Sequence, residues 1–244
     1  MTQSALIQGG SGGLGRALVN RILQSNQFDQ VVVTGRDIQK IDPRDPRVIP
    51  IELDLLSDQS ILDASTAIAA QIDTLNLVVT TAGILQDESL DLKPEKKFAD
   101  LTRSNLETVF SVNCFGPFLW YAALGRLIRH REPITIATLS ARVASIGDNR
   151  LGGWHSYRAS KTAQNMLTKN LSLELSRTNP HAIVVGLHPG TVDSNLSKPF
   201  QSGIPQKQLL HPKDAARSLL NVVSRLKLDD SGKVFDWRGD LILP

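Results

Sequence analysis

Residues 9–15 read Gly9-Gly10-Ser11-Gly12-Gly13-Leu14-Gly15, and this glycine-rich stretch determines the predicted fold. It follows the apolar run Ala5-Leu6-Ile7 directly and precedes an amphipathic segment, residues 16–23. Glycines adopt backbone conformations that other residues avoid, and they let a ligand approach the backbone closely. The free N–H groups at the start of a helix, together with its dipole, attract phosphate. The stretch therefore predicts a strand–turn–helix unit that binds the diphosphate of a dinucleotide.

Apolar runs alternate with helical patterns along the whole chain, which predicts βαβ units and a parallel sheet. The expected strands are residues 4–7, 30–34, 48–53, 75–80, 134–139, 182–187 and 233–235. The expected helices are residues 57–71 with Ser57 as a cap, a long helix from a capping-box pattern at Ser104 toward Ile128, and residues 212–226. The prediction is a Rossmann-type α/β fold, a doubly wound parallel sheet in a single domain of residues 1–244.

The composition argues against several classes of function. The 27 basic and 24 acidic residues are scattered and give a net charge of only +3, so we expect no nucleic-acid partner. No segment approaches the roughly 18 apolar residues that a membrane span needs, so we expect no membrane association. The single cysteine, Cys114, cannot form an internal disulfide, which indicates a reducing compartment and a cytoplasmic protein. The five histidines form no ligand-spaced pair, so no metal is expected.

Tyr157-Arg-Ala-Ser-Lys161 is the second informative stretch. Residues four apart in a helix share one face, so Tyr157 and Lys161 are expected to lie side by side. An ammonium beside a phenol favours the phenolate and lowers its pKa from the usual value of about 10. Such a phenol can exchange a proton with a carbonyl or an alcohol. Ordinary amphipathic helices also carry this spacing, but the glycine stretch upstream favours a catalytic pair.

The spacings Gly9-x-x-x-Gly13-x-Gly15 and Tyr157-x-x-x-Lys161 resemble those of the short-chain dehydrogenase/reductase family. Residues 140–161 and Phe235-Asp-Trp237 are similar to one branch, which holds C-factor-like proteins and sniffer-type carbonyl reductases. The resemblance implies about seven parallel strands and a homodimer or homotetramer packed through long helices. The chain departs from the family pattern at Gln8, where Thr is usual, and at Thr80-Thr81, where Asn-Asn is usual.

The resemblance also implies a set of cofactor-binding residues. They are Gly9, Ser11, Gly12, Gly13, Leu14, Gly15, Arg36, Asp54, Leu55, Ala82, Gly83, Tyr157, Lys161, Pro189, Gly190, Thr191 and Val192. Gly35 stands where the family's NAD-selecting Asp would lie, and Arg36 follows it. A guanidinium can bind a 2′-phosphate, so we expect NADP(H) rather than NAD(H). Asp37 leaves an alternative open, because it could bind a ribose or pair with Arg36.

Two further catalytic positions follow from the resemblance. Asn113 would hold a water that relays protons to Lys161. A serine after the fifth strand would orient the substrate carbonyl, and we assign this role to Ser140, with Ser145 as the second choice. Counted from the strand, however, the usual position falls on Ala141. If neither hydroxyl reaches the substrate, the carbonyl lacks one polarising donor and activity would be weak or absent.

Two irregular stretches, residues 86–95 and 191–210, follow the fourth and sixth predicted strands. Ligands of such sheets bind at the carboxyl ends of the strands, so both stretches border the site, and we expect residues 191–210 to form a substrate lid. Trp154, Phe200 and Val143 are candidate pocket walls. The predicted function is that of an NADP(H)-dependent oxidoreductase, which reduces a small or medium carbonyl compound by hydride transfer with Tyr157 as the proton donor. The alternative is a dinucleotide-binding signalling or sensor protein with little turnover, which would share the fold and the cofactor site.

Overall fold

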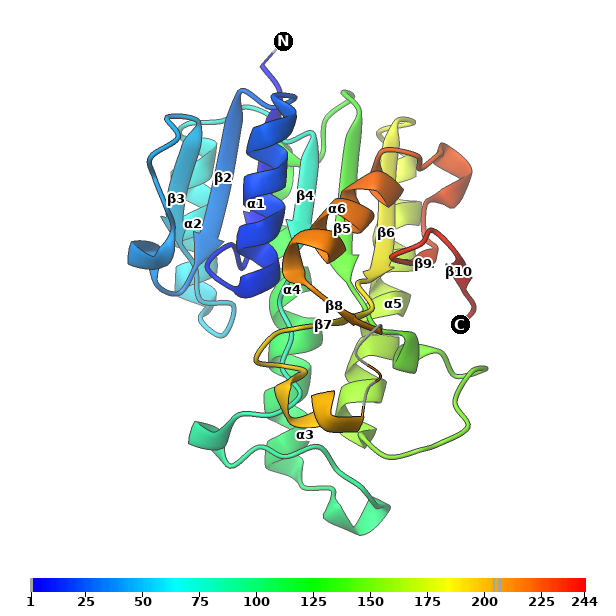
Figure 1. The fold of residues 1–244 in the computed structure, drawn as a ribbon. Coiled ribbons are helices and arrows are strands. Elements are labelled where there is room, and N and C mark those ends of the chain that lie inside the picture. The colour runs from blue at the N-terminus through cyan, green and yellow to red at the C-terminus, as the bar shows by residue number, and fades with distance from the viewer. Residues whose placement is uncertain (1, 204, 206–207) are drawn as a thin grey trace.

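The sheet at the centre of the protein has eight strands, in the order β10-β9-β6-β5-β4-β1-β2-β3 (Figure 1). We describe it from a computed structural model, in which residues 2–203, 205 and 208–244 are described. The strands are β1 (Ser4–Gln8), β2 (Gln30–Gly35), β3 (Val48–Glu52), β4 (Leu77–Thr80), β5 (Ile134–Leu139), β6 (Ala182–His188), β9 (Val234–Asp236) and β10 (Leu241–Ile242). The first seven pair in parallel, as predicted, and β10 adds an antiparallel edge.

Helices cover both faces of the sheet, because its strands are apolar on both sides. The covering helices are α1 (Gly13–Ser25) and α6 (Pro212–Val223) on one face, and α2 (Asp58–Ala69), α4 (Gly116–Leu124) and α5 (His155–Ser176) on the other (Figure 1). β1 shows the alternation: Ala5 and Ile7 pack in the core beside α1, whereas Leu6 packs in the core on the opposite face. The predicted doubly wound α/β fold is confirmed.

The long helix predicted from Ser104 toward Ile128 is divided in the structure. It comprises α3 (Arg103–Phe110), a π-helical turn (Ser111–Phe115) and α4. The capping-box prediction was wrong at this end, because the cap is Thr102, whose hydroxyl oxygen accepts a hydrogen bond from the Asn105 N–H at 3.1 Å. The π turn contains Asn113, and such turns are rare and often lie at functional sites.

The segments that follow the carboxyl ends of the strands form a smaller group below the sheet, near α3 (Figure 1). In the expected lid, β7 (Thr191–Val192) pairs with β8 (Leu209–Leu210), and a 3-10 helix covers Lys198–Gly203. Residues 204, 206 and 207 of that stretch lie outside the described residues. Across the described part of the chain, every helix is too short or too polar to traverse a lipid bilayer.

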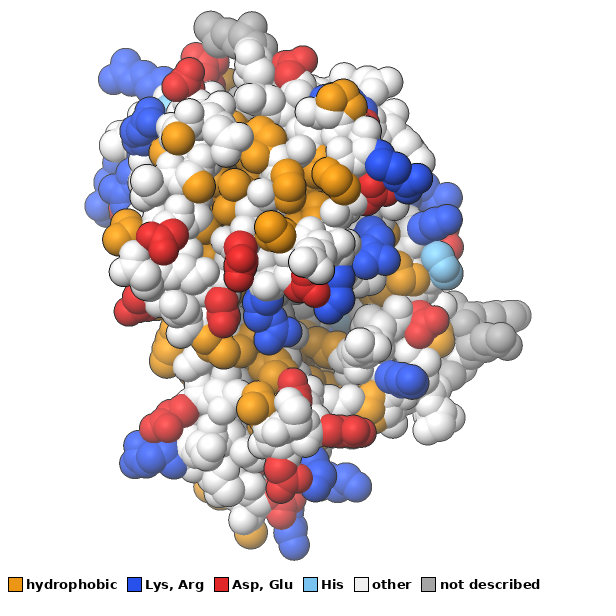
Figure 2. All heavy atoms as spheres, turned by 90° about the vertical axis from the view of Figure 1, so that its left-hand side faces the viewer, with side chains coloured by type: hydrophobic (Ala, Val, Ile, Leu, Met, Phe, Trp, Pro, Cys, Tyr) orange, Lys and Arg blue, Asp and Glu red, His pale blue; other side chains and the backbone are white. Residues whose placement is uncertain are grey.

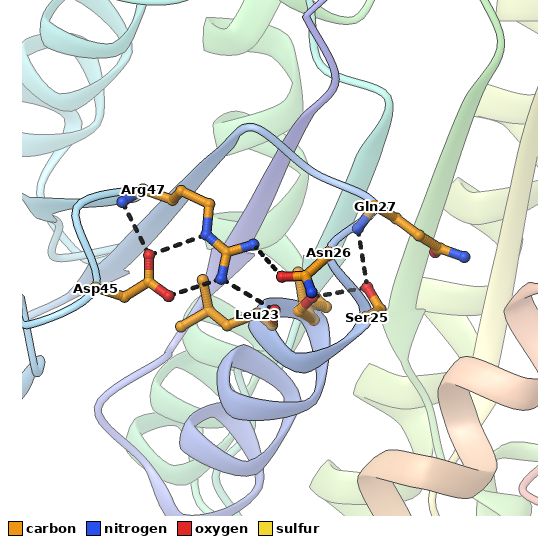
Figure 3. Close-up of polar contacts among 7 residues, drawn as sticks. Leu23, Ser25, Asn26, Gln27, Asp45 and Arg47 are labelled. Atoms are coloured by element: carbon orange, nitrogen blue, oxygen red, sulfur yellow. Dashed lines mark hydrogen bonds and ion pairs between the residues drawn. The ribbon is translucent and has the colours of Figure 1, made fainter.

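Arg47, which precedes β3, forms a group of hydrogen bonds at the amino edge of the sheet (Figure 3). Its guanidinium donates to the Leu23 carbonyl at the end of α1 and to the Asn26 side-chain oxygen, both at 3.0 Å. It also forms a two-pronged ion pair with Asp45, with N–O distances of 2.9 and 2.7 Å. Arg47 therefore gives a second hydrogen bond to a carbonyl that also accepts from the Asn26 N–H at 3.3 Å, and it connects the end of α1 to the β2–β3 connection.

Candidate active site

The glycine turn between β1 and α1 places the start of the helix at the carboxyl edge of the sheet. Gly9 has a φ of 82°, in the left-handed region that favours glycine. A Cβ on Gly15 would collide with the Gly9 backbone, so the first helical turn packs directly on the loop. The N-cap Gly12 supplies no side-chain hydrogen bond, and the first turn carries no acidic residue. The N–H groups of this turn are thus open to an anion.

The family departures at Gln8 and Thr81 are neighbours in the structure. The Gln8 side-chain oxygen accepts a hydrogen bond from the Ala82 N–H at 3.1 Å. The Thr81 hydroxyl donates to the Gln8 carbonyl at 2.8 Å. The two substitutions together therefore join the ends of β1 and β4 beside the glycine turn, and the backbone path at Ala82 and Gly83 remains close to that turn.

The end of β2 carries the residues predicted to select the cofactor. Arg36 is exposed there. Asp37 accepts from the Gln39 N–H and pairs with Lys40 at 2.9 Å, and the hydrogen bond from Lys40 lowers the pKa of the Asp37 carboxyl. Asp37 is therefore engaged by Lys40 rather than by Arg36. A Cβ on Gly35 would lie 2.8 Å from the Ser11 hydroxyl, so any side chain at position 35 would require the Ser11 hydroxyl to turn away.

The other predicted cofactor residues also lie after strand ends. Asp54 follows β3, and its carboxylate accepts from the Leu56 N–H at 3.0 Å. Pro189 and Gly190 follow β6, and Gly190 has a φ of 75°. Thr191 and Val192 form β7. Figure 2 views the molecule from the β3 side and shows its surface hollowed between the body and the lower group of segments, with Lys and Arg side chains beside the hollow.

Lys161 is buried on α5 and reaches the ends of two strands. Its ammonium group donates to the Leu139 carbonyl at 2.7 Å, to the Gln164 side-chain oxygen at 2.8 Å and to the Ala82 carbonyl at 3.4 Å. Burial lowers the pKa of Lys161 to about 7. The cation thus stands between the ends of β4 and β5, where a bound nicotinamide ribose is expected.

Tyr157 lies one helical turn before Lys161 and is 8% exposed. Among the described residues, none forms a hydrogen bond with its hydroxyl, which leaves this group available to a substrate. Burial raises the pKa of Tyr157 to about 12. The predicted lowering by Lys161 does not hold for this arrangement of the chain, because the Lys161 ammonium is directed to the oxygens of Leu139, Gln164 and Ala82.

Asn113 is fully buried in the π turn and holds two segments together. Its side-chain oxygen accepts from the Ile84 N–H at 2.7 Å, and its amide donates to the Ile84 carbonyl at 2.9 Å and to the Ser160 hydroxyl at 3.0 Å. Ser160 in turn donates to the Tyr157 carbonyl at 2.8 Å. Both amide hydrogens are therefore used within the chain, so Asn113 reaches the catalytic helix through Ser160.

The structure gives Ser140 a different environment from the predicted one. Its hydroxyl donates to the side-chain oxygen of Asn165 on α5 at 2.6 Å. The next residue, Ala141, is the one that packs against Tyr157. The second choice, Ser145, donates to the Pro244 carbonyl and accepts from the Asp148 N–H. Ser140 and Ala141 both follow β5, but Ala141 is still extended, with a φ of −144° and a ψ of 145°. Neighbouring side chains of an extended chain point to opposite sides, so a shift of one position places a methyl instead of a hydroxyl beside the tyrosine.

An apolar cluster surrounds Tyr157. Leu85 and Ala141 are buried in it, and Val143, Trp154, Leu196 and Phe200 pack around them. The Trp154 ring lies 4.8 Å from that of Phe200 and stands edge-to-face to Tyr157 at 6.3 Å. The three candidate walls Trp154, Phe200 and Val143 are thus brought together. Leu85 and Leu196 were not predicted, because Leu85 follows Ile84 at the start of a polar loop and Leu196 is a lone apolar residue, so neither has a local signal.

The sequence analysis also missed Ser160 and Gln164. Both lie three residues after a predicted catalytic residue, on the same face of α5 as Tyr157 and Lys161. Helical spacing alone is a signal that could have identified them. They hydrogen-bond to Asn113 and Lys161 respectively, so they hold the expected catalytic groups in place.

The family model described as short chain dehydrogenase matches residues 3–204. The chain belongs to the short-chain dehydrogenase family. The NADPH-bound carbonyl reductase from chicken fatty liver superposes with a TM-score of 0.87 at 25% identity, covering 100% of this chain and 99% of that one. The carbonyl reductase Sniffer of D. melanogaster gives 0.85 at 21% identity over 100% of both chains. The C-signal protein of Myxococcus xanthus is 31% identical over 141 residues, 57% of this chain and 79% of that protein.

These similarities agree with the branch that the sequence indicated, which holds C-factor-like and sniffer-type short-chain dehydrogenases. As a member of the family, the protein is an oxidoreductase that binds a nicotinamide dinucleotide and acts on small molecules. The glycine turn fits such a cofactor, because the Gly15–Gly9 contact keeps side chains away from the helix start.

Proposed function

We propose that the protein is an NADP(H)-dependent carbonyl reductase that acts on a small or medium apolar carbonyl compound. The observation that carries the proposal is the position of Lys161, hydrogen-bonded to the strand-end carbonyls of Leu139 and Ala82, with Tyr157 one turn away among apolar side chains. A polar hydroxyl enclosed by apolar walls suits an uncharged substrate that has one polar atom. The chicken enzyme with NADPH supports the choice of cofactor.

Chain residues at the carboxyl edge would hold the cofactor, which supplies the hydride when bound. The first turn of α1, from Gly13 to Gly15, would bind the diphosphate. Arg36 would bind the 2′-phosphate, since it is exposed, position 35 carries no carboxylate, and Asp37 pairs with Lys40. The further cofactor contacts that we propose are Gly9, Gly12, Leu14, Asp54, Leu55, Ala82, Gly83, Pro189, Gly190, Thr191 and Val192.

Tyr157 is the proton donor in this proposal. With a pKa of about 12 it stays protonated at neutral pH, so it can give its proton to the carbonyl oxygen as the alcohol forms. Lys161 would hold the ribose and stabilise the resulting phenolate by its charge. Asn113, linked to Tyr157 through Ser160, would accept a hydrogen bond from the water that returns the proton, since its side-chain oxygen has a second lone pair and both of its amide hydrogens are used. The walls formed by Trp154 and the lid residue Phe200 would exclude bulk water.

Tyr157→Phe tests the proposal, because it removes only the hydroxyl. We expect NADPH consumption with a panel of aldehydes, ketones and quinones to fall at least a hundredfold, while fluorescence titration still shows NADPH binding. Tyr121→Phe is the matched control, since Tyr121 is the only other tyrosine and its hydroxyl is bonded to Thr138 away from the pocket. Full turnover by Tyr157→Phe would contradict the assignment.

The same assays separate the enzyme from a sensor. An enzyme consumes NADPH with at least one carbonyl in the panel, and it binds NADPH more tightly than NADH. Saturable NADPH binding without consumption by the wild-type protein would instead support a dinucleotide-binding signalling protein.

Apolar side chains on the α4 and α5 side of the molecule support a homo-oligomer. Phe115 just before α4, Leu119 on α4, and Met166 and Leu173 on α5 are each about half exposed or more. We propose that these helices pack against a second copy, in a homodimer or homotetramer.

Burial raises the pKa of the one thiol, Cys114, and an inert thiol fits our proposal of a cytoplasmic enzyme.

A further inference from the structure

Glu95 is an acidic residue buried beside the catalytic helix. It is 3% exposed, and none of the ion pairs within the described part of the chain includes it. Its carboxylate accepts hydrogen bonds from Ser156, from the N–H at 3.3 Å and from the hydroxyl. A buried carboxylate needs such compensation, and the positive end of the α5 dipole adds to it.

The start of α5 has no cap of its own. Trp154 occupies the N-cap position, where its side chain makes no capping hydrogen bond, and its φ of 51° and ψ of 43° are left-handed. The Trp154 N–H donates to the Glu95 carbonyl at 2.6 Å. Glu95 therefore accepts hydrogen bonds from the start of α5 with both its backbone carbonyl and its carboxylate, although it lies about sixty positions earlier in the sequence.

This turn holds the groups on which catalysis depends. Tyr157 is the third residue of α5, directly after Ser156. Trp154 stands edge-to-face to Tyr157 and contacts Phe200 of the lid. A rotation of the first turn would therefore move the proton donor and one wall of the pocket together.

We propose that Glu95 is a positioning residue, which holds the first turn of α5 so that the Tyr157 hydroxyl meets the substrate carbonyl. The inference rests on the proposed carbonyl reductase function. Glu95 itself does not touch the reacting atoms; it acts through Ser156 and Trp154. Because a displacement of about 1 Å at a reacting group can lower a rate about a hundredfold, loss of this anchor should act on kcat.

Glu95→Gln is the decisive variant, because glutamine keeps the shape and one acceptor oxygen but loses the charge. We expect kcat to fall at least tenfold, with the Kd for NADPH unchanged within twofold. Ser156→Ala should lower kcat to a similar extent, and the double variant should lose no more than the worse single variant, as residues acting through one contact do. The matched control is Ser57→Ala, which removes the cap of α2, a helix that carries no proposed site residue.

Wild-type kcat in Glu95→Gln would overturn the inference. An equal loss of kcat in Ser57→Ala, at the same thermal stability, would also overturn it. The loss of any helix cap would then lower kcat, and the effect would not be specific to Glu95. A second measurement does not need turnover: hydrogen exchange of the amides of residues 156–158 should accelerate in Glu95→Gln, while the centre of α5 stays protected. Unchanged hydrogen exchange at residues 156–158 would overturn the inference, whether or not the wild type consumes NADPH. A wild type that consumes no NADPH would count against the proposed function alone.

Discussion

At the scale of single residues, the site contains a lysine that the fold has taken out of water. Lys161 is 2% exposed, and its three N–H groups are all bonded to uncharged oxygens of Leu139, Gln164 and Ala82. These bonds orient the ammonium, but no carboxylate neutralises it. Burying this cation costs free energy of folding. Such a cost is typical of sites where function opposes stability.

Lys161→Met tests this opposition through pH. The pKa of Lys161 is lowered from 10.5 to about 7 by burial. Between these values the unfolded chain binds more protons than the folded chain, so the free energy of unfolding rises with pH from about 7 to 10.5 and becomes independent of this group below about 7. Urea unfolding of the cofactor-free protein should show that rise in the wild type relative to Lys161→Met. Parallel stability curves for the two proteins between pH 7 and 10 would contradict it.

Ala141→Ser is the second prediction at this scale. Ala141 packs against Tyr157, so a hydroxyl placed there is within reach of the same carbonyl oxygen. A donor aimed at a developing oxyanion contributes strongly to such reactions, and we expect kcat to rise about tenfold while the Kd for NADPH stays constant. Steady-state kinetics on the best carbonyl of the panel measure this. An unchanged or lower kcat in a folded variant would show that the pocket already polarises the carbonyl by other means.

At the scale of elements, strands and caps differed in how far the sequence could predict them. The seven parallel strands were found because most are buried on both faces and read as apolar runs, although β3, at the edge of the sheet, is only partly buried. The helix start at Thr102 was misplaced, because Ser104 and Glu107 also satisfy the capping pattern. The glycine turn and the Tyr157–Lys161 pair are local geometry and were predictable. Whether Ser140 or Ala141 lies beside Tyr157 depends on the residue at which β5 ends, and this has no local signal in the sequence. The Glu95 contact joins distant segments and has none either.

The Arg47 anchor at the end of α1 gives a prediction at this scale (Figure 3). Arg47→Lys cannot reach Leu23, Asn26 and Asp45 together, because an ammonium lacks the planar fork, so the thermal midpoint should fall.

The hydrogen bond from Arg47 lowers the pKa of Asp45 to about 2, below its unfolded value of 3.8. The anchor is thus intact above about pH 4 and is lost as pH falls toward 2. The stability difference between wild type and Asp45→Asn should shrink over that range; a constant difference would contradict this.

At the scale of the whole molecule, the exposed apolar side chains on the α4 and α5 side remain without a partner in a single chain. Leu119 and Met166 are 49% and 62% exposed. Leu119→Glu should convert an oligomer to monomers, because it introduces charge into the proposed helix contact. Light scattering after size exclusion measures this, with Leu243→Glu as control, since Leu243 is exposed and follows the edge strand β10 rather than lying on α4 or α5. A wild-type protein that is monomeric at micromolar concentration would contradict the proposed oligomer.

The close approach of Gly35 to the Ser11 hydroxyl has a consequence for anyone who redesigns this scaffold. A side chain added at position 35 would bring its Cβ to 2.8 Å from the Ser11 hydroxyl, so Ser11 must turn away before an acidic residue there could reach a ribose. In the cofactor site that we propose, a smaller residue at position 11 would remove this conflict. A change of dinucleotide preference at position 35 is therefore coupled to the residue at position 11.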